Sequence, residues 1–227
     1  MSAVTIAQRV GEVRERIASA CLRAGRDPSE ITVVAASKSR SPAEVLEAYR
    51  AGILDFGENY WQDARPKIEA CPPDIRWHFI GALQSNKAKY VARHFQVLQS
   101  LHSLELAAIL SKALTVVDKK LQVLVEVNID REHSKSGVPP EQALELAAQV
   151  GSIPRLELCG LMTMGAAGVS ESELRTRFRT MRALFEQLPS QERRVLSMGM
   201  TSDYEVAVEE GATMVRIGTA IFGPRPQ

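Results

Sequence analysis

The sequence predicts an α/β fold, a single (β/α)8 TIM barrel, because short apolar runs alternate with helical stretches along its 227 residues. The eight runs that we predict to be strands span residues 31–36, 53–56, 77–80, 97–100, 122–129, 156–162, 195–198 and 214–217. Several are apolar at successive positions, as QVLVEVNI at 122–129 is, and this pattern is typical of strands covered on both faces. Helices between such strands make neighbouring strands parallel, and eight strand–helix units in about 200 residues favour closure into a barrel.

An extra amphipathic helix is expected before the first strand. Apolar residues recur there every three or four positions, and the helix should end near Gly25. Its predicted apolar face consists of Val4, Ala7, Val10, Val13, Ile17 and Ala20. No linker or low-complexity tract interrupts the chain, so we expect one domain over residues 1–227. A doubly wound open sheet with fewer strands is the alternative, because the pattern does not reveal closure and the second and fourth runs are the least distinct.

The composition indicates which partners the protein can bind and in which cellular compartment it is expected. With 28 Lys and Arg against 27 Asp and Glu, the net charge of +1 lacks the positive excess that non-specific nucleic-acid binding requires. The three cysteines are far apart and odd in number, which predicts neither a disulfide framework nor a metal clamp and favours the reducing cytoplasm. The N-terminus lacks the apolar core of a signal peptide, and no run approaches a membrane span. We expect a soluble, cytoplasmic protein without an apolar dimer face, and therefore a monomer.

Polar residues follow the predicted strands at the end where a barrel carries its functional loops. Lys38 comes two residues after the first strand, so its amine should emerge at the barrel mouth, partly dehydrated. Dehydration lowers the pKa of a lysine and frees the amine to attack a carbonyl group. A surface lysine just past a strand is the simpler alternative from the local sequence alone.

The loops after the last two predicted strands carry hydroxyl groups and glycines, in GMTSD at 199–203 and RIGTAIFG at 216–223. Thr201 or Ser202 offers a hydroxyl, while Gly218 and Thr219 offer backbone N–H groups, and these are the groups that hold phosphate in barrel proteins. Capping of the next helix by Thr201, Ser202 or Asp203 is a compatible alternative.

Other charged residues leave alternatives open. Arg216 lies within an apolar strand and needs a partner inside the barrel, either a salt bridge or a ligand. His78 is expected to be a hydrogen-bonded core residue, and the four histidines lack metal-binding spacing, so no metal is predicted. Lys87 and Lys89 belong to a solvated helix face or attract an anion near the rim. Lys135 lies in a flexible loop or reaches a carbonyl cofactor as a second lysine.

Several segments together resemble the pyridoxal-phosphate homeostasis protein family, whose barrel is similar to that of alanine racemase, the fold type III of pyridoxal-phosphate proteins. The matching segments are ASKSR around Lys38, FGENYWQD at 56–63, WHFIGALQSNK at 77–87, SKSG at 134–137, GLMTM at 160–164 and the stretch GMTSDYEVAVEEGATMVRIGTAIFG at 199–223. Their joint order and spacing are specific, and they cover nearly the whole chain.

The resemblance implies a Schiff base between pyridoxal 5′-phosphate and Lys38, with Arg216 facing the pyridine nitrogen. It implies that Asn59 and Met200 line the ring pocket. The phosphate is expected on Thr201, Ser202, Gly218 and Thr219. The family usually has serine where this chain has Thr201, which keeps the hydroxyl and adds a methyl group.

An arginine against the ring nitrogen disfavours its protonation and so weakens the ring as an electron sink. This favours a cofactor carrier, not an enzyme, that exchanges pyridoxal phosphate by transimination, with amino acids or apoenzymes as partners. A racemase of the alanine racemase type is the alternative. Alanine racemase has an additional C-terminal β domain and a catalytic tyrosine supplied across a dimer as its second base, so Tyr60 or Tyr204 would have to substitute here. A barrel that binds another phosphorylated metabolite without a covalent bond is the second alternative.

Overall fold

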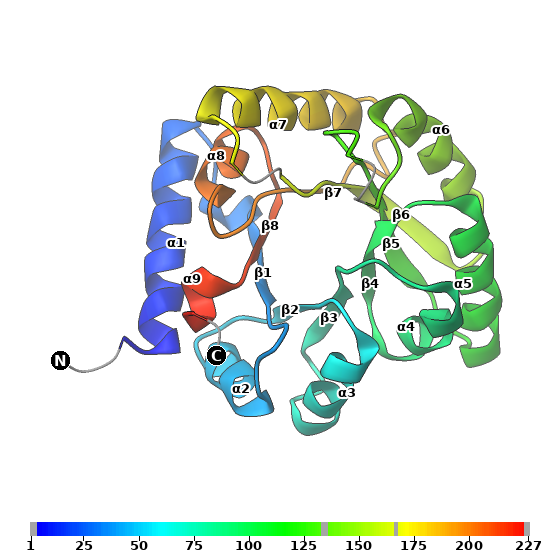
Figure 1. The fold of residues 1–227 in the computed structure, drawn as a ribbon, viewed down its shortest axis with the longest axis horizontal. Helices are drawn as coiled ribbons and strands as arrows, with labels where there is room; N and C mark the ends of the chain where they lie inside the picture. Colours follow the sequence, from blue (N-terminus) through cyan, green and yellow to red (C-terminus); the bar gives the residue numbers. More distant parts are fainter. Residues whose placement is uncertain (1–3, 133–135, 166–167, 225–227) are drawn as a thin grey trace.

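The computed structural model of the chain describes residues 4–132, 136–165 and 168–224, and its parallel strands close into a barrel in sequence order (Figure 1). The strands are β1 (Thr32–Ala36), β2 (Asp55–Glu58), β3 (Arg76–Phe79), β4 (Val97–Leu101), β5 (Leu121–Glu126), β6 (Leu156–Met162), β7 (Val195–Ser197) and β8 (Met214–Ile217). β8 pairs with β1, with Val34 opposite Arg216, and this pairing completes the ring. The closed barrel is confirmed, and the open doubly wound sheet is wrong.

Six of the eight strands have a boundary that differs from the sequence prediction, and β2 and β5 differ by two residues or more. β2 begins at Asp55 instead of residue 53, because Ile53 and Leu54 belong to the segment that enters the barrel. β5 ends at Glu126 instead of residue 129, because Val127 leaves the ladder and bridges to Val138. Apolar side chains extend past the hydrogen-bonded strand in both places, so a hydropathy pattern cannot locate these ends.

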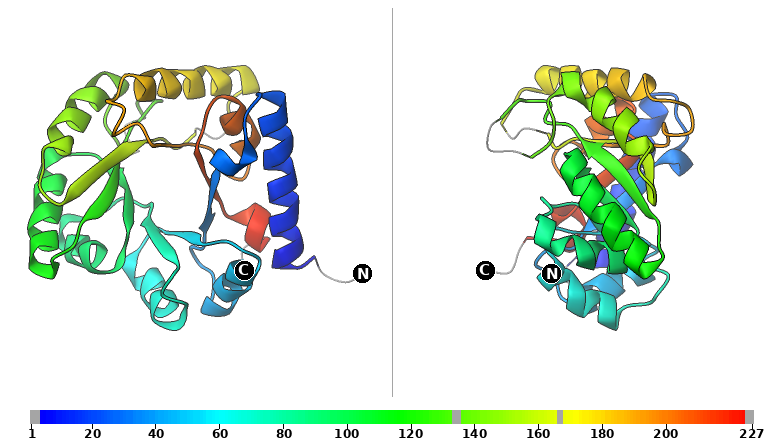
Figure 2. Two further views of the ribbon diagram at one scale, coloured as in Figure 1. Left: turned by 180° about the vertical axis from the view of Figure 1, so that it is seen from behind. Right: turned by 90° about the vertical axis from the view of Figure 1, so that its right-hand side faces the viewer.

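Helices form an outer ring around the strands (Figures 1 and 2). They are α1 (Ile6–Arg23), α2 (Pro42–Arg50), α3 (Trp61–Ala70), α4 (Ala88–His94), α5 (Leu104–Val117), α6 (Pro140–Gly151), α7 (Glu171–Glu186), α8 (Tyr204–Glu209) and α9 (Thr219–Phe222). Short 3-10 turns at Pro28–Glu30 and Ser85–Lys87 complete the described elements. No described helix is long and apolar enough to cross a membrane.

The predicted N-terminal helix is present as α1, and its phase corrects two residues of the predicted face. Thr5 begins the helix through a capping box with Gln8, so Val4 lies outside the helix and is exposed. The buried face includes Ile6 instead of Ala7, because Ile6 is one helical turn before Val10. The helix ends at Arg23, two residues before Gly25, whose φ of 64° marks the turn.

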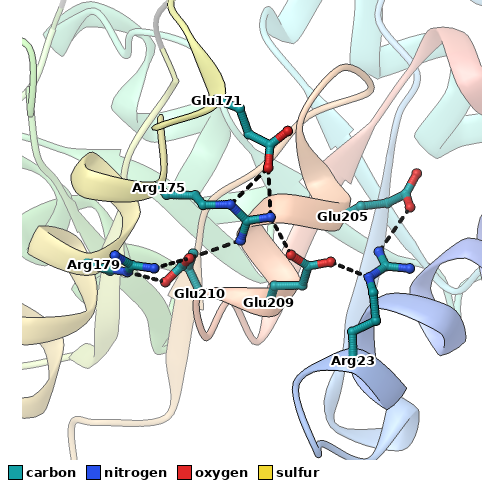
Figure 3. A network of polar contacts seen from close by, with 7 residues as sticks. All are labelled: Arg23, Glu171, Arg175, Arg179, Glu205, Glu209 and Glu210. Atoms are coloured by element: carbon teal, nitrogen blue, oxygen red, sulfur yellow. Dashed lines mark hydrogen bonds and ion pairs between the residues drawn. The ribbon is translucent and has the colours of Figure 1, made fainter. Parts of the chain in front are cut away.

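α1 packs against α8, α9 and α2, and so covers the place where β8 closes on β1 (Figure 1). Charged side chains join α1 and α8 to α7 on the outside of the barrel (Figure 3). In this network Arg175 of α7 donates to Glu209 and Glu210, and Arg23 of α1 donates to Glu209 at 2.5 Å. The first helix is thereby tied to elements from the end of the chain.

The interior of the barrel is partly polar. A small apolar cluster of Leu124, Cys159 and Met162 lies apart from the main core, which packs between the strands and the helices. Other side chains buried near the barrel axis are polar or charged: His78, Gln99, Glu126, Ser197 and Arg216. Buried polar groups are costly unless they are hydrogen-bonded, so this interior is specialised for more than packing.

Candidate functional site

The predicted site residues lie at the C-terminal ends of four neighbouring strands, β7, β8, β1 and β2. These strands are consecutive around the closed barrel. A Cβ atom on Gly218 would lie 3.4 Å from the carbonyl oxygen of Ala36, so the end of β8 approaches the end of β1 closely. Lys38 follows Ala36 by two residues, and Asn59 directly follows β2. Residues from four distant segments are therefore gathered on one side of the rim.

Lys38 lies in a tight turn directly after β1 and is half-buried. The backbone N–H of Arg40 donates to the carbonyl of Ser37 at 3.0 Å, and Ser39 adopts a left-handed conformation with φ of 62°. A left-handed conformation is uncommon for a residue other than glycine, and such strain is often found at functional sites. The half-buried position differs from that of a freely solvated surface lysine.

A buried ion pair holds the residue before Lys38, and sequence reasoning did not find it. Lys67 of α3 donates to Glu58 Oε1 at 2.6 Å and to the carbonyl oxygen of Ser37 at 2.7 Å. The hydroxyl of Ser37 donates to the same Glu58 oxygen at 2.5 Å. Burial raises the pKa of Glu58, and the charge of Lys67 opposes that rise. The polar Glu58 at an apolar strand end was the one available signal.

Arg40 joins the Lys38 turn to the end of α9. Its Nη2 donates to the carbonyl oxygens of Gly223 at 2.6 Å and Pro224 at 3.0 Å, and Nη1 pairs with Glu44 at 3.2 Å. The guanidinium group also lies 5.6 Å from the centre of the Phe222 ring. Arg40 thus fixes two parts of the rim relative to each other, because planar guanidinium groups hold several acceptors in one geometry.

The loops after β7 and β8 form a cup of backbone N–H groups around one hydroxyl. Thr201 Oγ1 accepts from the N–H of Gly218 at 3.2 Å and lies 3.5 Å from the N–H of Ala220. Ser202 and Thr219 are exposed at the edge of this cup. Convergent backbone N–H groups of this kind favour an anion. Of the four residues that the sequence assigned to phosphate, the structure brings Thr201 and Gly218 into contact, and Ser202 and Thr219 follow them directly in the two loops.

The capping alternative for this loop is wrong for Thr201 and Asp203. The Thr201 hydroxyl bonds to the chain after β8, and the N-cap residue of α8, Asp203, makes no side-chain cap bond. The Asp203 carboxylate instead accepts from the N–H of Met200 at 2.5 Å. Burial raises the pKa of Asp203, and this hydrogen bond and the charge of Arg216 oppose the rise. Asp203 therefore shapes the loop that carries Met200.

Arg216 is buried inside the barrel, and its expected partner is present. Nη1 donates to Ser197 Oγ at 2.6 Å, and Nη2 donates to the carbonyl oxygen of Thr163 at 2.7 Å. These partners are neutral, so the contact salt bridge that the sequence left open is not among the described interactions. Burial lowers the pKa of Arg216 to about 10, with Asp203 and Glu126 opposing, so the side chain stays charged at neutral pH.

A carboxyl group that the sequence reasoning overlooked lies within reach of this charge. Glu126 at the end of β5 is buried, and its Oε2 has no hydrogen-bond partner in the described part of the chain. Burial raises the pKa of Glu126, while His102 and Arg216 oppose the rise. An isolated acidic residue in the run QVLVEVNI was the available signal, but a pattern of apolar residues does not say which face of a strand an acid occupies.

Asn59 and Met200 are both half-buried at the rim. A Cβ atom on Gly81 would lie 2.5 Å from the Asn59 carbonyl oxygen, so a glycine is needed where the loops after β2 and β3 meet. Tyr60 is exposed and Tyr204 is 3% exposed. A buried tyrosine is poorly placed to act as the second base of a racemase.

The lysines outside the predicted site are placed differently. Lys87, at the end of the 3-10 turn, and Lys89 of α4 lie with their Nζ atoms 5.8 and 5.1 Å from the centre of the Tyr90 ring. Lys135 is outside the described residues. Within the described ranges, no group of three or more His, Cys, Asp or Glu side chains is placed to hold a metal ion.

Comparison with known proteins first defines the class. The family model described as "Alanine racemase, N-terminal domain" matches residues 11–226. An alanine racemase of Clostridium difficile superposes with a TM-score of 0.75 at 12% identity, over 94% of this chain and 60% of its own. Fold and family model together make this chain a barrel of the alanine racemase N-terminal type.

Closer relatives define the particular family. A pyridoxal phosphate homeostasis protein of Haemophilus influenzae is 41% identical over 98% of this chain and 97% of its own, and one of Escherichia coli K12 is 42% identical over 97% of each. The chain belongs to the pyridoxal phosphate homeostasis protein family, which confirms the resemblance seen in the sequence. These relatives are named as homeostasis proteins, and the likeness to racemases shows the fold alone.

Solved structures agree with this assignment. An unknown protein from Bifidobacterium adolescentis superposes with a TM-score of 0.90 at 36% identity, over 96% of this chain and 94% of its own. PipY of Synechococcus elongatus, solved with pyridoxal phosphate bound, has a TM-score of 0.80 at 34% identity, over 93% of this chain and 100% of its own.

Proposed function

We propose that this protein holds pyridoxal 5′-phosphate covalently on Lys38 and releases it by exchange with amines, as part of cofactor homeostasis. The observation that carries the proposal is the meeting of three different groups on β1, β7 and β8. These are the half-buried Lys38, the N–H cup around Thr201 and the buried Arg216. An amine, an anion cup and a donor are the groups that the aldehyde, the phosphate and the pyridine nitrogen of the cofactor require.

The cup fits a phosphate because its N–H groups already converge on an oxygen atom, that of Thr201. A phosphate oxygen would replace the Thr201 oxygen as the acceptor for the N–H group of Gly218, with Thr219 as the expected second N–H donor, and the hydroxyls of Thr201 and Ser202 would donate. Hydrogen bonds to a charged acceptor are about twice as strong as neutral ones. The phosphate would therefore provide most of the binding energy and orient the aldehyde toward Lys38.

The covalent step follows from the chemistry of a primary amine. The Nζ atom of Lys38 attacks the aldehyde carbon, a C=N bond forms, and the aldehyde oxygen leaves as water. An incoming amine attacks the same carbon, and Lys38 leaves with its amine restored. Amino acids or lysines of apoenzymes would supply that amine. The turn around Ser39 and the ion pair of Lys67 with Glu58 keep Lys38 in place throughout.

Arg216 directs the bound cofactor toward storage instead of reaction. An arginine can only donate hydrogen bonds, so the ring nitrogen opposite it would stay unprotonated and withdraw few electrons. Exchange at the aldehyde does not need that electron withdrawal, whereas racemisation does. The free thiols of Cys21, Cys71 and Cys159 fit the cytoplasmic setting in which we place this monomeric carrier.

Absorbance spectroscopy tests the proposal. Purified protein incubated with pyridoxal phosphate should show a band near ~420 nm, the usual region for the cofactor bound to a lysine. Borohydride should fix the adduct, and peptide mapping should find it on Lys38. The variant Lys38→Ala should lack the band, while the control Lys87→Ala, in the 3-10 turn before α4, should keep it. A colourless wild-type protein, or an adduct on another lysine, would contradict the proposal.

A further inference from the structure

A continuous series of hydrogen bonds crosses the barrel interior from Arg216 to Asp55, and we name these five residues the Arg216–Asp55 relay. Arg216 Nη1 and Ser197 Oγ are 2.6 Å apart, and Ser197 Oγ and Gln99 Oε1 are 2.7 Å apart. Gln99 Nε2 lies 2.9 Å from His78 Nδ1, and His78 Nε2 lies 2.8 Å from Asp55 Oδ1. Ser197, Gln99 and His78 are completely buried.

The relay is a connection through the middle of the barrel and not along its wall. Ser197 belongs to β7 and Gln99 to β4, and these two strands are not neighbours in the sheet. Their side chains therefore meet across the interior. Barrel interiors are normally filled by layers of branched apolar side chains, and each buried polar group there has a desolvation cost. A relay of buried polar residues at this position needs a reason beyond packing.

The two ends of the relay fix the direction of every hydrogen bond. Arg216 can only donate, so Ser197 Oγ accepts from it and must give its own hydrogen to Gln99 Oε1. The amide nitrogen of Gln99 then faces His78 Nδ1, which must be unprotonated to accept. His78 consequently carries its hydrogen on Nε2 and donates it to Asp55, which as a carboxylate can only accept.

Two independent contacts support this direction. Gln99 Nε2 also lies 3.2 Å from Met214 Sδ, a weak acceptor, so both amide hydrogens are used and a flipped amide would lose both bonds. Burial lowers the pKa of His78, with Asp55 opposing, which agrees with a neutral imidazole. A protonated His78 would force Gln99 to turn and leave the Ser197 hydrogen without its acceptor.

We propose that Ser197, Gln99, His78 and Asp55 are positioning residues for Arg216, which hold its guanidinium group in one orientation and transmit the negative charge of Asp55 to it. The inference rests on the proposed function, because Arg216 is the group expected opposite the pyridine nitrogen. Hydrogen bonds in a row polarise one another in a low-dielectric interior, so a charge at one end strengthens the bond at the other. Arg216 reaches the rim with two of its nitrogen atoms already committed to Ser197 and Thr163.

Asp55 makes the inference testable without disturbing the cofactor site. It begins β2, at the end of the barrel opposite to the rim, and 18% of its side chain is exposed. It lines a cavity of about 550 Å³ between α1 and the first residues of β1 and β2. Its other charged neighbour is Arg76, 3.9 Å away. A bound cofactor at the rim would not touch Asp55, so any effect of its substitution must pass through the protein.

The experiment compares pyridoxal phosphate binding by Asp55→Asn, Ser197→Ala and the double variant. Asp74→Asn is the control, because Asp74 accepts a hydrogen bond from Tyr49 and precedes β3 at the same end of the barrel, outside the relay. Dissociation constants from absorbance titrations should rise about threefold to tenfold in each relay variant. The pH at which the absorbance band of the bound cofactor changes should shift downward in Asp55→Asn and in Ser197→Ala. The control Asp74→Asn should have the dissociation constant and the band of the wild type.

The double variant tests whether Asp55 and Ser197 act through the same relay. If they do, the second substitution removes an interaction that the first has already broken, so the two effects do not add. The double variant should bind no more weakly than Ser197→Ala, and nuclear magnetic resonance should find the hydrogen of His78 on Nε2. Wild-type affinity and band in Asp55→Asn, or additive effects in the double variant, would overturn the relay while leaving the proposed function intact. A wild-type chain that binds no pyridoxal phosphate would instead overturn the proposed function and this inference with it.

Discussion

A buried ion pair of Lys67 with Glu58 lies beside the turn that carries Lys38. Glu58 is completely buried and Lys67 is 3% exposed. Lys67 donates to Glu58, and Glu58 also accepts from the hydroxyl of Ser37 in the turn that carries Lys38. Removing one partner of such a pair leaves a charge in a low-dielectric interior. The pair therefore contributes to stability mainly because it prevents an unpaired buried charge, and the attraction between its two members contributes less.

We expect Lys67→Met to lower the free energy of unfolding by about 3 to 5 kcal/mol, because Glu58 would keep a buried charge without its cation. The double variant Lys67→Met with Glu58→Gln should recover most of this loss, since neither remaining side chain is charged. Urea unfolding of the three proteins measures the effect. A single variant within about 1 kcal/mol of the wild type would show that the pair carries no such cost.

Between elements, the charged network of Figure 3 ties α7 to α8 and α1. Arg175 donates to Glu209 at 2.6 Å, to Glu210 at 3.0 Å and to Glu171 at 2.9 Å. Burial raises the pKa of Glu209, but hydrogen bonds from Arg175 and Arg23 outweigh it and hold that pKa below the usual range. A carboxyl group with a lowered pKa stabilises the fold above its unfolded pKa and loses this contribution as the pH falls.

The variant Arg175→Gln should lower the free energy of unfolding by about 1 to 2 kcal/mol at neutral pH, because the largely buried carboxylates of Glu209 and Glu210 lose a shared cation. The difference from the wild type should shrink as the pH falls from about 5 to about 3, and also in high salt. Arg65→Gln is the matched control, since Arg65 pairs with Glu69 alone on the surface of α3 and should change stability by less than about 0.5 kcal/mol. Equal effects of the two variants would contradict a network role.

For the whole molecule, the two ends of the chain are held in one structure. β8 pairs with β1, and α1 packs against α8 and α9, so the first and last described elements of the chain contact one another directly. We therefore propose that the chain unfolds as one domain. Calorimetry should show a single transition in the apo protein, and two separate transitions would contradict it.

Pyridoxal phosphate should raise this single transition as a whole. A ligand at 100 times its dissociation constant stabilises a protein by about 2.7 kcal/mol, provided that it binds the folded state alone. Lys38→Ala should show a smaller shift at the same concentration because it keeps the phosphate cup and loses the covalent bond. An equal shift in both proteins would show that Lys38 adds nothing to binding.

The sequence by itself determined the order of the elements, the helix before the first strand and the end of the barrel to which each loop after a strand belongs. These features follow from local patterns: apolar runs mark strands, and parallel strands with helical crossovers place every strand end on one rim. Lys38, the loop at Thr201 and Gly218 were predicted to lie on this rim in this way. Boundaries at Asp55 and Glu126 were missed, because apolar side chains continue past the hydrogen-bonded ladder.

Only the tertiary structure decided which polar side chains meet. Ser197 and Gln99 are separated by 98 positions, and their bond exists because β7 and β4 face each other across a closed barrel. Lys67 reaches Glu58 because the phase of α3 turns it inward, and the phase of α1 likewise replaced Ala7 with Ile6 on its buried face. Periodicity gives the spacing of a pattern, but the pairing of distant polar groups depends on strand tilt, helix phase and burial, which arise only when the barrel closes.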